Sequence, residues 1–91
     1  MKKIGFVIID EQNNGEEFRN GEIFRNKKEV IKTLVSYHSI DWTGEDDNGN
    51  EITLEEKIKQ FKTIQEKLEF LLDYGVWGIQ RRKFSRRKKN D

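Results

Sequence analysis

Few side chains in this sequence have the chemistry that covalent catalysis requires. The chain has no cysteine, and its only histidine is His38. A serine or threonine nucleophile needs a neighbouring base, and a zinc site needs several Cys or His ligands. His38 falls on the apolar face of a predicted helix, so we interpret it as a partly buried structural histidine. We therefore predict a protein that is not an enzyme, with no catalytic residue, no cofactor and no bound metal.

Carboxylates allow two metal-binding interpretations, and both are weak. Residues 44–55 have the look of a calcium-binding loop when Gly49 is aligned with the glycine that such loops require. The first ligand position would then be Gly44, where an aspartate is needed. A nuclease-like centre would require acids such as Asp10, Asp41 and Glu51 to converge, and 17 acidic residues offer such sets by chance. An ordinary solvated hairpin is the preferred interpretation of this loop.

The charged residues are segregated along the chain, although 18 basic and 17 acidic residues leave a net charge of only +1. Residues 41–56 contain seven acids and no Lys or Arg, whereas residues 81–89 contain seven bases and no acid. The near-zero net charge therefore conceals a dipolar molecule. Charge runs are usually solvated surface, and each run is also a candidate binding surface.

The acidic run is the first candidate binding surface. Carboxylates on a loop, with an aromatic anchor beside them, have the chemistry to dock on the basic groove of a nucleic-acid-handling protein. The residues expected to bind such a partner are Trp42, Glu45, Asp46, Asp47 and Glu51. Trp42 is equally compatible with a place in the core.

The basic run is the second candidate surface. Its cations would neutralise phosphates and release counterions, and Phe84 among them would stack on an unpaired base. Such contacts give affinity with little sequence specificity. The residues expected on this nucleic-acid-binding or second partner surface are Arg81, Arg82, Lys83, Phe84, Arg86, Arg87 and Lys88. The acidic loop of one copy could also meet the basic tail of another, which would give self-association.

Three segments have the composition of strands. Residues 4–9 form a β-branched apolar run, which is typical of a strand covered on both faces. Residues 16–25 are expected to hold a second strand, and residues 76–79 a last short one. Residues 39–53 are expected to form a hairpin around Asn48-Gly49, a dipeptide that favours a tight type I′ turn.

Two segments have the periodicity of amphipathic helices. Asn26 and a glutamate three residues later have capping-box spacing, and they predict a short helix over 27–38. Thr53 begins a second capping box, and the apolar stripe behind it predicts one helix of five turns over 54–72. Gly75 suits the left-handed position that ends such a helix.

Elements in the order β-β-α-(β-hairpin)-α-β predict a small single α+β domain. A short antiparallel sheet would pack against one short and one long amphipathic helix, with residues 1–80 forming the domain and 81–91 a basic, flexible tail. The chain has no apolar run near the roughly 20 residues that span a bilayer, and the apolar run near its N-terminus is too short for a signal peptide. We expect a cytoplasmic protein without a membrane partner.

These features favour a non-enzymatic interaction protein. The chain has no proline and no alanine and is rich in Lys, Ile and Asn, which indicates an AT-rich gene. The preferred hypothesis is an accessory or inhibitor factor of a phage or mobile element that binds a host protein handling nucleic acid. The alternative is a protein that binds DNA or RNA directly through its basic C-terminal segment, and a small metal-dependent enzyme is a residual hypothesis.

Overall fold

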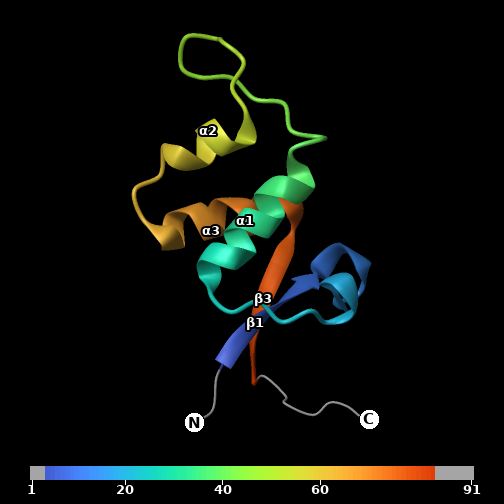
Figure 1. Cartoon of the computed structure of the whole chain (residues 1–91). Helices are drawn as coiled ribbons and strands as arrows, with labels where there is room; N and C mark the ends of the chain where they lie inside the picture. The colour runs from blue at the N-terminus through green and yellow to red at the C-terminus, as the bar shows by residue number, and fades with distance from the viewer. Residues whose placement is uncertain (1–3, 84–91) are drawn as a thin grey trace.

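The sheet is built around β1 (Ile4–Asp10), its central strand. In this computed structural model, which describes residues 4–83, β1 pairs antiparallel with β2 (Glu16–Glu17) on one side and with β3 (Trp77–Lys83) on the other. Figure 1 shows β1 and β3 lying side by side, with the helices gathered against one end of them. The predicted α+β class with a short antiparallel sheet is confirmed.

The predicted second strand over 16–25 is wrong in extent. After the two residues of β2 the chain turns through a short 3-10 segment, and it rejoins β1 only at an isolated bridge between Phe24 and Phe6. Arg19, Asn20 and Gly21 have φ angles of 51°, 59° and 84°, which no extended strand can contain. The apolar contacts expected from this segment are nevertheless present, because Phe24 is buried in the core.

Helix α1 (Lys27–His38) has the predicted bounds, and its local signals explain why. The Asn26 side chain accepts a hydrogen bond from the Glu29 N–H at 2.9 Å, which satisfies one of the free donors at the helix start. Glu29 Oε1 in turn accepts from the Arg25 N–H at 3.1 Å. The apolar face of the helix then enters the core of the protein, whose buried members include Ile8, Phe24, Val30, Leu34, Leu54, Ile58, Leu68, Leu71 and Trp77.

The single long helix predicted over 54–72 is wrong, because two helices share its apolar stripe. Helix α2 (Leu54–Lys59) ends after six residues, and α3 (Ile64–Gly75) begins behind a new capping box. Thr63 Oγ1 accepts from the Glu66 N–H at 3.0 Å, and the Glu66 carboxylate accepts from the Thr63 N–H at 3.3 Å. Reciprocal caps of this kind stabilise a helix start. The chain therefore turns between the two helices, and α2 lies above α3 in Figure 1.

The boundary expected between domain and tail at residue 81 is also corrected. Strand β3 continues through Arg81, Arg82 and Lys83, which pair in register with Phe6, Gly5 and Ile4 of β1. These bases therefore extend the sheet in the described part of the chain. The rest of the expected tail, residues 84–91, lies outside the described residues.

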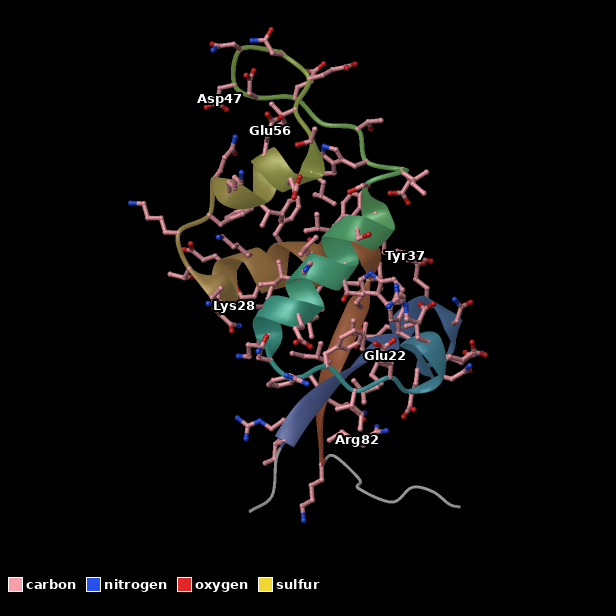
Figure 2. The ribbon with its side chains drawn as sticks, viewed as in Figure 1. Glu22, Lys28, Tyr37, Asp47, Glu56 and Arg82 are labelled. Carbon is pink, nitrogen blue, oxygen red and sulfur yellow. The ribbon has the colours of Figure 1, made fainter. Side chains whose placement is uncertain are left out.

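The described protein is elongated, with extents of 53 × 29 × 16 Å. Figure 1 shows the connection between α1 and α2 projecting at one end and the paired strands β1 and β3 reaching to the other. The acids of residues 41–56 and the bases of residues 81–83 therefore lie at opposite ends. The acidic run and the described part of the basic run are thus separated in space as well as in sequence (Figure 1 and Figure 2).

The junction between α3 and β3 is held by a buried hydrogen bond. Trp77 Nε1 donates to His38 Nε2 at 2.9 Å, which ties the start of β3 to the end of α1. A Cβ on Gly75 would overlap both of these nitrogen atoms. Gly75 is therefore needed for space, and the left-handed position predicted for it falls one residue later, on Val76 (φ 56°, ψ 52°). Left-handed backbone is costly for a β-branched residue.

We expect Gly75→Ala to lower the free energy of unfolding by about 2 kcal/mol, because the added methyl group displaces the Trp77–His38 pair. Alanine is the better helix former by about 1 kcal/mol, so propensity alone predicts the opposite sign. Urea unfolding followed by tryptophan fluorescence measures the change. Val76→Gly is the matched control, and relief of the left-handed strain should raise stability by about 1 kcal/mol. A Gly75→Ala protein as stable as the parent would contradict the overlap.

Candidate functional site

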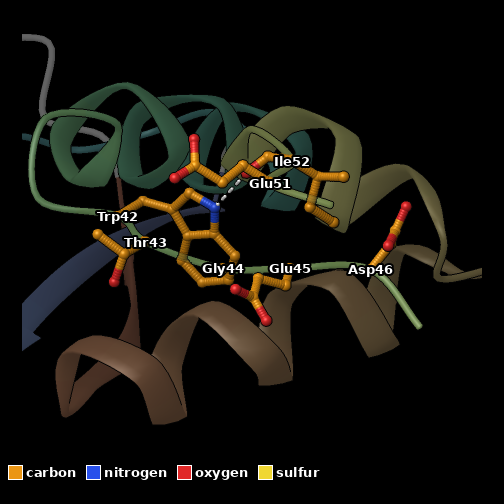
Figure 3. Close-up of a pocket in the computed structure, with 7 residues that line it drawn as sticks. All are labelled: Trp42, Thr43, Gly44, Glu45, Asp46, Glu51 and Ile52. Carbon is orange, nitrogen blue, oxygen red and sulfur yellow. Dashed lines mark hydrogen bonds between the residues drawn. The ribbon is translucent and has the colours of Figure 1, made fainter. Parts of the chain in front are cut away.

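The projecting loop, defined as residues 39–53 between α1 and α2, is anchored by Trp42. Trp42 Nε1 donates to the Ile52 carbonyl oxygen at 2.9 Å, and Figure 3 shows this bond across the loop. The indole also packs edge-on against Phe70 and Tyr74 of α3, with ring centroids 6.1 and 5.5 Å away. Trp42 therefore holds the loop on the protein, and its only polar atom is already used.

The tip of the projecting loop is a three-residue turn instead of the predicted type I′ turn. The Gly49 N–H donates to the Asp46 carbonyl at 3.0 Å, and the Asp46 N–H donates to the Asn50 carbonyl at 2.8 Å. Gly49 is left-handed (φ 83°), but Asn48 is not, whereas a type I′ turn needs positive φ at both central residues. The hairpin expected over residues 39–53 is wrong in its arms, which are not strands: only the isolated bridge between Glu45 and Glu51 joins them, around this different turn.

The Asp46 carboxylate belongs to the turn itself. Its Oδ1 accepts from the Asn48 N–H and from the Asn50 N–H, each at 2.9 Å. The hydrogen bond from Asn50, with help from Asn48, holds the pKa of Asp46 below its ordinary value of 3.8. Of the five residues assigned to the acidic surface, Trp42 and Asp46 thus have structural partners inside the loop.

Glu45 and Glu51 lie opposite each other in the backbone pairing of the two arms of the loop. They form an isolated antiparallel bridge, flanked by hydrogen bonds from the Asp46 N–H to the Asn50 carbonyl and from the Ile52 N–H to the Gly44 carbonyl. Bonds on both sides mark a non-hydrogen-bonded pair, in which side chains lie closest together. Like charges directly opposite in such a pair destabilise it. Among the described residues, no hydrogen bond or ion pair involves either of these two carboxylates.

Within residues 4–83, no Lys or Arg forms an ion pair with a carboxylate of the projecting loop. The ion pairs of this region join Arg19 to Glu22, Arg82 to Glu17 and His38 to Asp41, and none reaches the loop tip. Glu45, Asp47 and Glu51 are exposed, and Figure 2 shows Asp47 at the far end of the molecule. Beneath them lies an open hollow of about 600 Å³, lined by Trp42, Thr43, Gly44, Glu45, Asp46, Glu51 and Ile52 (Figure 3).

Metal chemistry has no geometric support in the part of the chain that the structure describes. No group of three or more His, Cys, Asp or Glu side chains there is placed to hold an ion. In the loop compared above with a calcium site, one carboxylate oxygen of Asp46 already accepts hydrogen bonds from two amides of its own turn. Asp10 lies at the end of β1 and Asp41 in the projecting loop.

The single histidine is buried, and only 6% of its surface is exposed. Because Trp77 donates to Nε2, that atom accepts and the ring proton is on Nδ1. Nδ1 lies 3.5 Å from Asp41 Oδ1, an electrostatic contact without a formed hydrogen bond. Burial, and secondarily the nearby Asp41 charge, raises the pKa of the adjacent Tyr74 hydroxyl. Nε2 of His38 thus has a structural partner, whereas its buried Nδ1 makes no hydrogen bond.

The basic surface is only partly described. Arg81 and Lys83 are exposed on β3, whereas Arg82 donates to Glu17 at 2.9 Å and to Gln80 at 3.0 Å and so braces the sheet. Figure 2 shows Arg82 at the end of the molecule opposite Asp47. The other residues assigned to this surface, Phe84, Arg86, Arg87 and Lys88, lie outside the described residues.

Sequence reasoning missed one residue at the root of the projecting loop. Ile40 is 94% exposed, beside the half-exposed Tyr37 at the end of α1. In a segment expected to be a hairpin strand, an isoleucine is predicted to lie in the core. No local sequence signal indicates that this one is exposed to solvent. Ile40 adds an exposed apolar side chain at the root of the projecting loop, next in sequence to Asp41.

No family model matches the chain, and comparisons with curated proteins and with solved structures also gave no match. Within residues 4–83, none of the helices has the length and apolarity that a membrane span requires. The functional argument therefore depends on the surfaces described above.

We expect Asp46→Ala to loosen the loop tip, because the Asn48 and Asn50 amides lose their shared acceptor. Amide exchange at Asn50 should accelerate at least about tenfold, the loss expected for one charge-assisted hydrogen bond. Asp47→Ala is the matched control and should leave this exchange unchanged.

Acid should mimic Asp46→Ala in the parent protein. The folded-state pKa of Asp46 is lowered, so its contribution is complete above the unfolded value and is lost as pH falls through the lower folded value. Equal exchange at Asn50 in both alanine variants would contradict the assigned role.

Proposed function

We propose that this protein is a non-enzymatic binding protein whose projecting loop docks on a basic surface of another protein. The observation that carries the proposal is the Glu45–Glu51 pair, two like charges held opposite each other without a described cation. Such an arrangement costs stability in the free protein. A basic partner would turn the same arrangement into a favourable one.

The order of the projecting loop supports the proposal. The Trp42 anchor and the Asp46 turn hold its backbone before any partner arrives. A preorganised loop loses little conformational entropy on binding, so more of the interaction energy appears as affinity. Exposed Ile40 adds an apolar side chain at the root of the same loop. Acidic side chains with a nearby apolar anchor suit a partner surface that is basic and partly apolar.

The class of partner follows from its charge. Dense patches of Lys and Arg are the electrostatic footprint of proteins that bind nucleic acid. A rigid loop carrying uncompensated carboxylates would occupy such a patch and exclude the phosphates that normally bind there. We therefore propose an inhibitor or accessory factor, of a phage or mobile element, that acts on a nucleic-acid-handling protein of its host. The AT-rich composition is the support for this origin.

Replacing Glu51 separates a binding role from a structural one. We expect Glu51→Lys to raise the free energy of unfolding by roughly 0.5 kcal/mol, because it converts a like-charge pair into an opposite-charge pair. The same change should weaken capture of the partner from a low-GC bacterial lysate at least about tenfold, and nucleic acid added to the lysate should compete with that capture.

The matched control for this experiment is Glu69→Lys on α3, which changes the net charge equally at an exposed site away from the loop. It should leave capture unchanged. Asp46 is left intact because its carboxylate closes the turn. Capture by the Glu51→Lys protein that equals capture by the parent would reject the loop as the docking surface.

Direct binding of nucleic acid is the second candidate function, favoured by exposed Arg81 and Lys83 at the projecting end of the sheet. Truncation after Gln80 would remove three residues of β3, so the double variant Arg81→Ala/Lys83→Ala is the cleaner test. Fluorescence anisotropy with labelled DNA and RNA over a salt series should show weaker binding and a salt slope smaller by about 2. An unchanged slope would remove β3 from nucleic-acid binding.

A further inference from the structure

Strand β3 lies at the edge of the sheet, because the strand order is β2-β1-β3. The main-chain hydrogen bonds of β1 show which backbone N–H and C=O groups of β3 face away from the sheet. Phe6 exchanges both main-chain hydrogen bonds with Phe24, each at 2.8 Å, so its N–H and C=O point away from β3. Phe6 and Arg81 are therefore a non-hydrogen-bonded pair of the β1–β3 ladder. In such a pair the N–H and C=O of both residues face away from each other.

A second bond fixes the same alternation independently. The Glu11 N–H donates to the Val76 carbonyl at 3.2 Å, so Val76 faces β1, as do the alternate residues Gly78, Gln80 and Arg82. The outward groups on β3 are then those of Ile79, Arg81 and Lys83. Within residues 4–83 these three make no backbone hydrogen bond on the open side. The edge thus presents three successive donor–acceptor pairs.

The side chains of these residues give the edge its charge. Arg81 and Lys83 are exposed and have no ion-pair partner among the described residues, while Ile79 packs partly against the core. Arg82 has its side chain on the other face of the sheet, where it is paired with Glu17. Basic residues on an edge strand resist pairing with another copy of the same edge, since like charges would lie opposite each other. The same residues favour an acidic strand.

We propose that the open edge of β3 binds an extended acidic segment of a partner protein, which adds to the sheet as a fourth, antiparallel strand. Antiparallel pairing would place acidic residues opposite Lys83 and Arg81 and an apolar residue opposite Ile79. The recognised pattern is therefore acidic, any, acidic, any, apolar, read from the N-terminus of the segment. Main-chain bonds supply affinity, and the alternating side chains supply specificity.

A second copy of this chain does not fit as the occupant. The sequence has only one place with acids two residues apart, Glu45 and Asp47, and the residue that follows at the same spacing is Gly49. No segment of the protein thus has the pattern that β3 selects. This surface is separate from the projecting loop at the other end and selects a partner of opposite charge, so one molecule could join two different proteins.

Amide exchange on the full chain tests the strand addition directly. The probe is a synthetic peptide of about ten residues in which threonines surround two glutamates and one valine in the stated pattern. In the free protein, Gln80 and Arg82 amides should be protected while those of Ile79, Arg81 and Lys83 exchange freely. Saturating peptide should slow exchange of these three outward amides at least about tenfold, as one new hydrogen bond each predicts.

Two variants separate the main-chain contribution from the charge. Arg81→Ala removes the cation and should weaken peptide binding about threefold, while Arg81→Pro also removes the outward N–H, not used by β1, and should weaken it about tenfold or more. Gln80→Ala, whose side chain lies on the other face, is the matched control and should bind as the parent does. Amide spectra of each variant establish that it is folded.

Several outcomes would overturn the proposal. Outward amides already protected in the free protein would mean that the edge is not open. Peptide binding that leaves these amides exchanging freely would mean attraction by charge alone, as expected if DNA or RNA is the ligand of Arg81 and Lys83. Equal binding of a peptide with lysines in place of the glutamates would remove the charge selection, and no binding would remove the site. None of these results bears on the projecting loop.

Discussion

The buried hydrogen bond between Trp77 and His38 determines how α1 and the sheet strand β3 are placed relative to each other. It joins the end of α1 to the first residue of β3, elements that are 39 residues apart in the sequence. A buried polar pair of this kind must be complete, because either partner alone would bear the cost of desolvation. Gly75 leaves the space that the pair occupies, and Val76 accepts a strained conformation so that the chain can turn directly into the strand.

This junction also sets the geometry of the two charged ends. Because Trp77 is fixed, β3 enters its ladder with Trp77 opposite Asp10 and runs to Lys83 opposite Ile4. The strand thus carries Arg81 and Lys83 away from the helices, while α1 leads directly into the projecting loop at the other end (Figure 1). The acids of the projecting loop and the exposed bases Arg81 and Lys83 thus lie at opposite ends of the described structure (Figure 1), and no ion pair joins the two groups within one copy.

Two features of the molecule oppose stability, for different reasons. The left-handed Val76 has a structural context, since it joins Gly75, which packs against the hydrogen-bonded ring pair, directly to the first residue of β3. The opposed Glu45 and Glu51 have no such context among the described contacts. An unfavourable arrangement without a structural reason is where a functional reason is best sought. This difference is the basis for placing the proposed docking surface on the projecting loop.

The amino-acid sequence by itself determined the features that depend on neighbours in the chain. The bounds of α1, the buried β1, the α+β class and the separated charge runs all follow from caps, periodicity and composition, which act over a few residues. Even the Asp46 turn has a local signal, because acidic and amide side chains two residues apart favour such turns.

Tertiary structure decided the rest, because it depends on contacts between distant segments. The break between α2 and α3 is an exception, because the Thr63–Glu66 capping box that starts α3 is itself a local signal. Strand β3 is longer than its apolar residues indicate, because β1 supplies a partner for Arg81 and Lys83. Gly75 is required because any side chain there would overlap the Trp77–His38 ring pair, and no local sequence pattern shows that contact. The opposition of Glu45 to Glu51 and the open edge of β3 likewise exist only once the chain has folded, because register arises from pairing and not from composition.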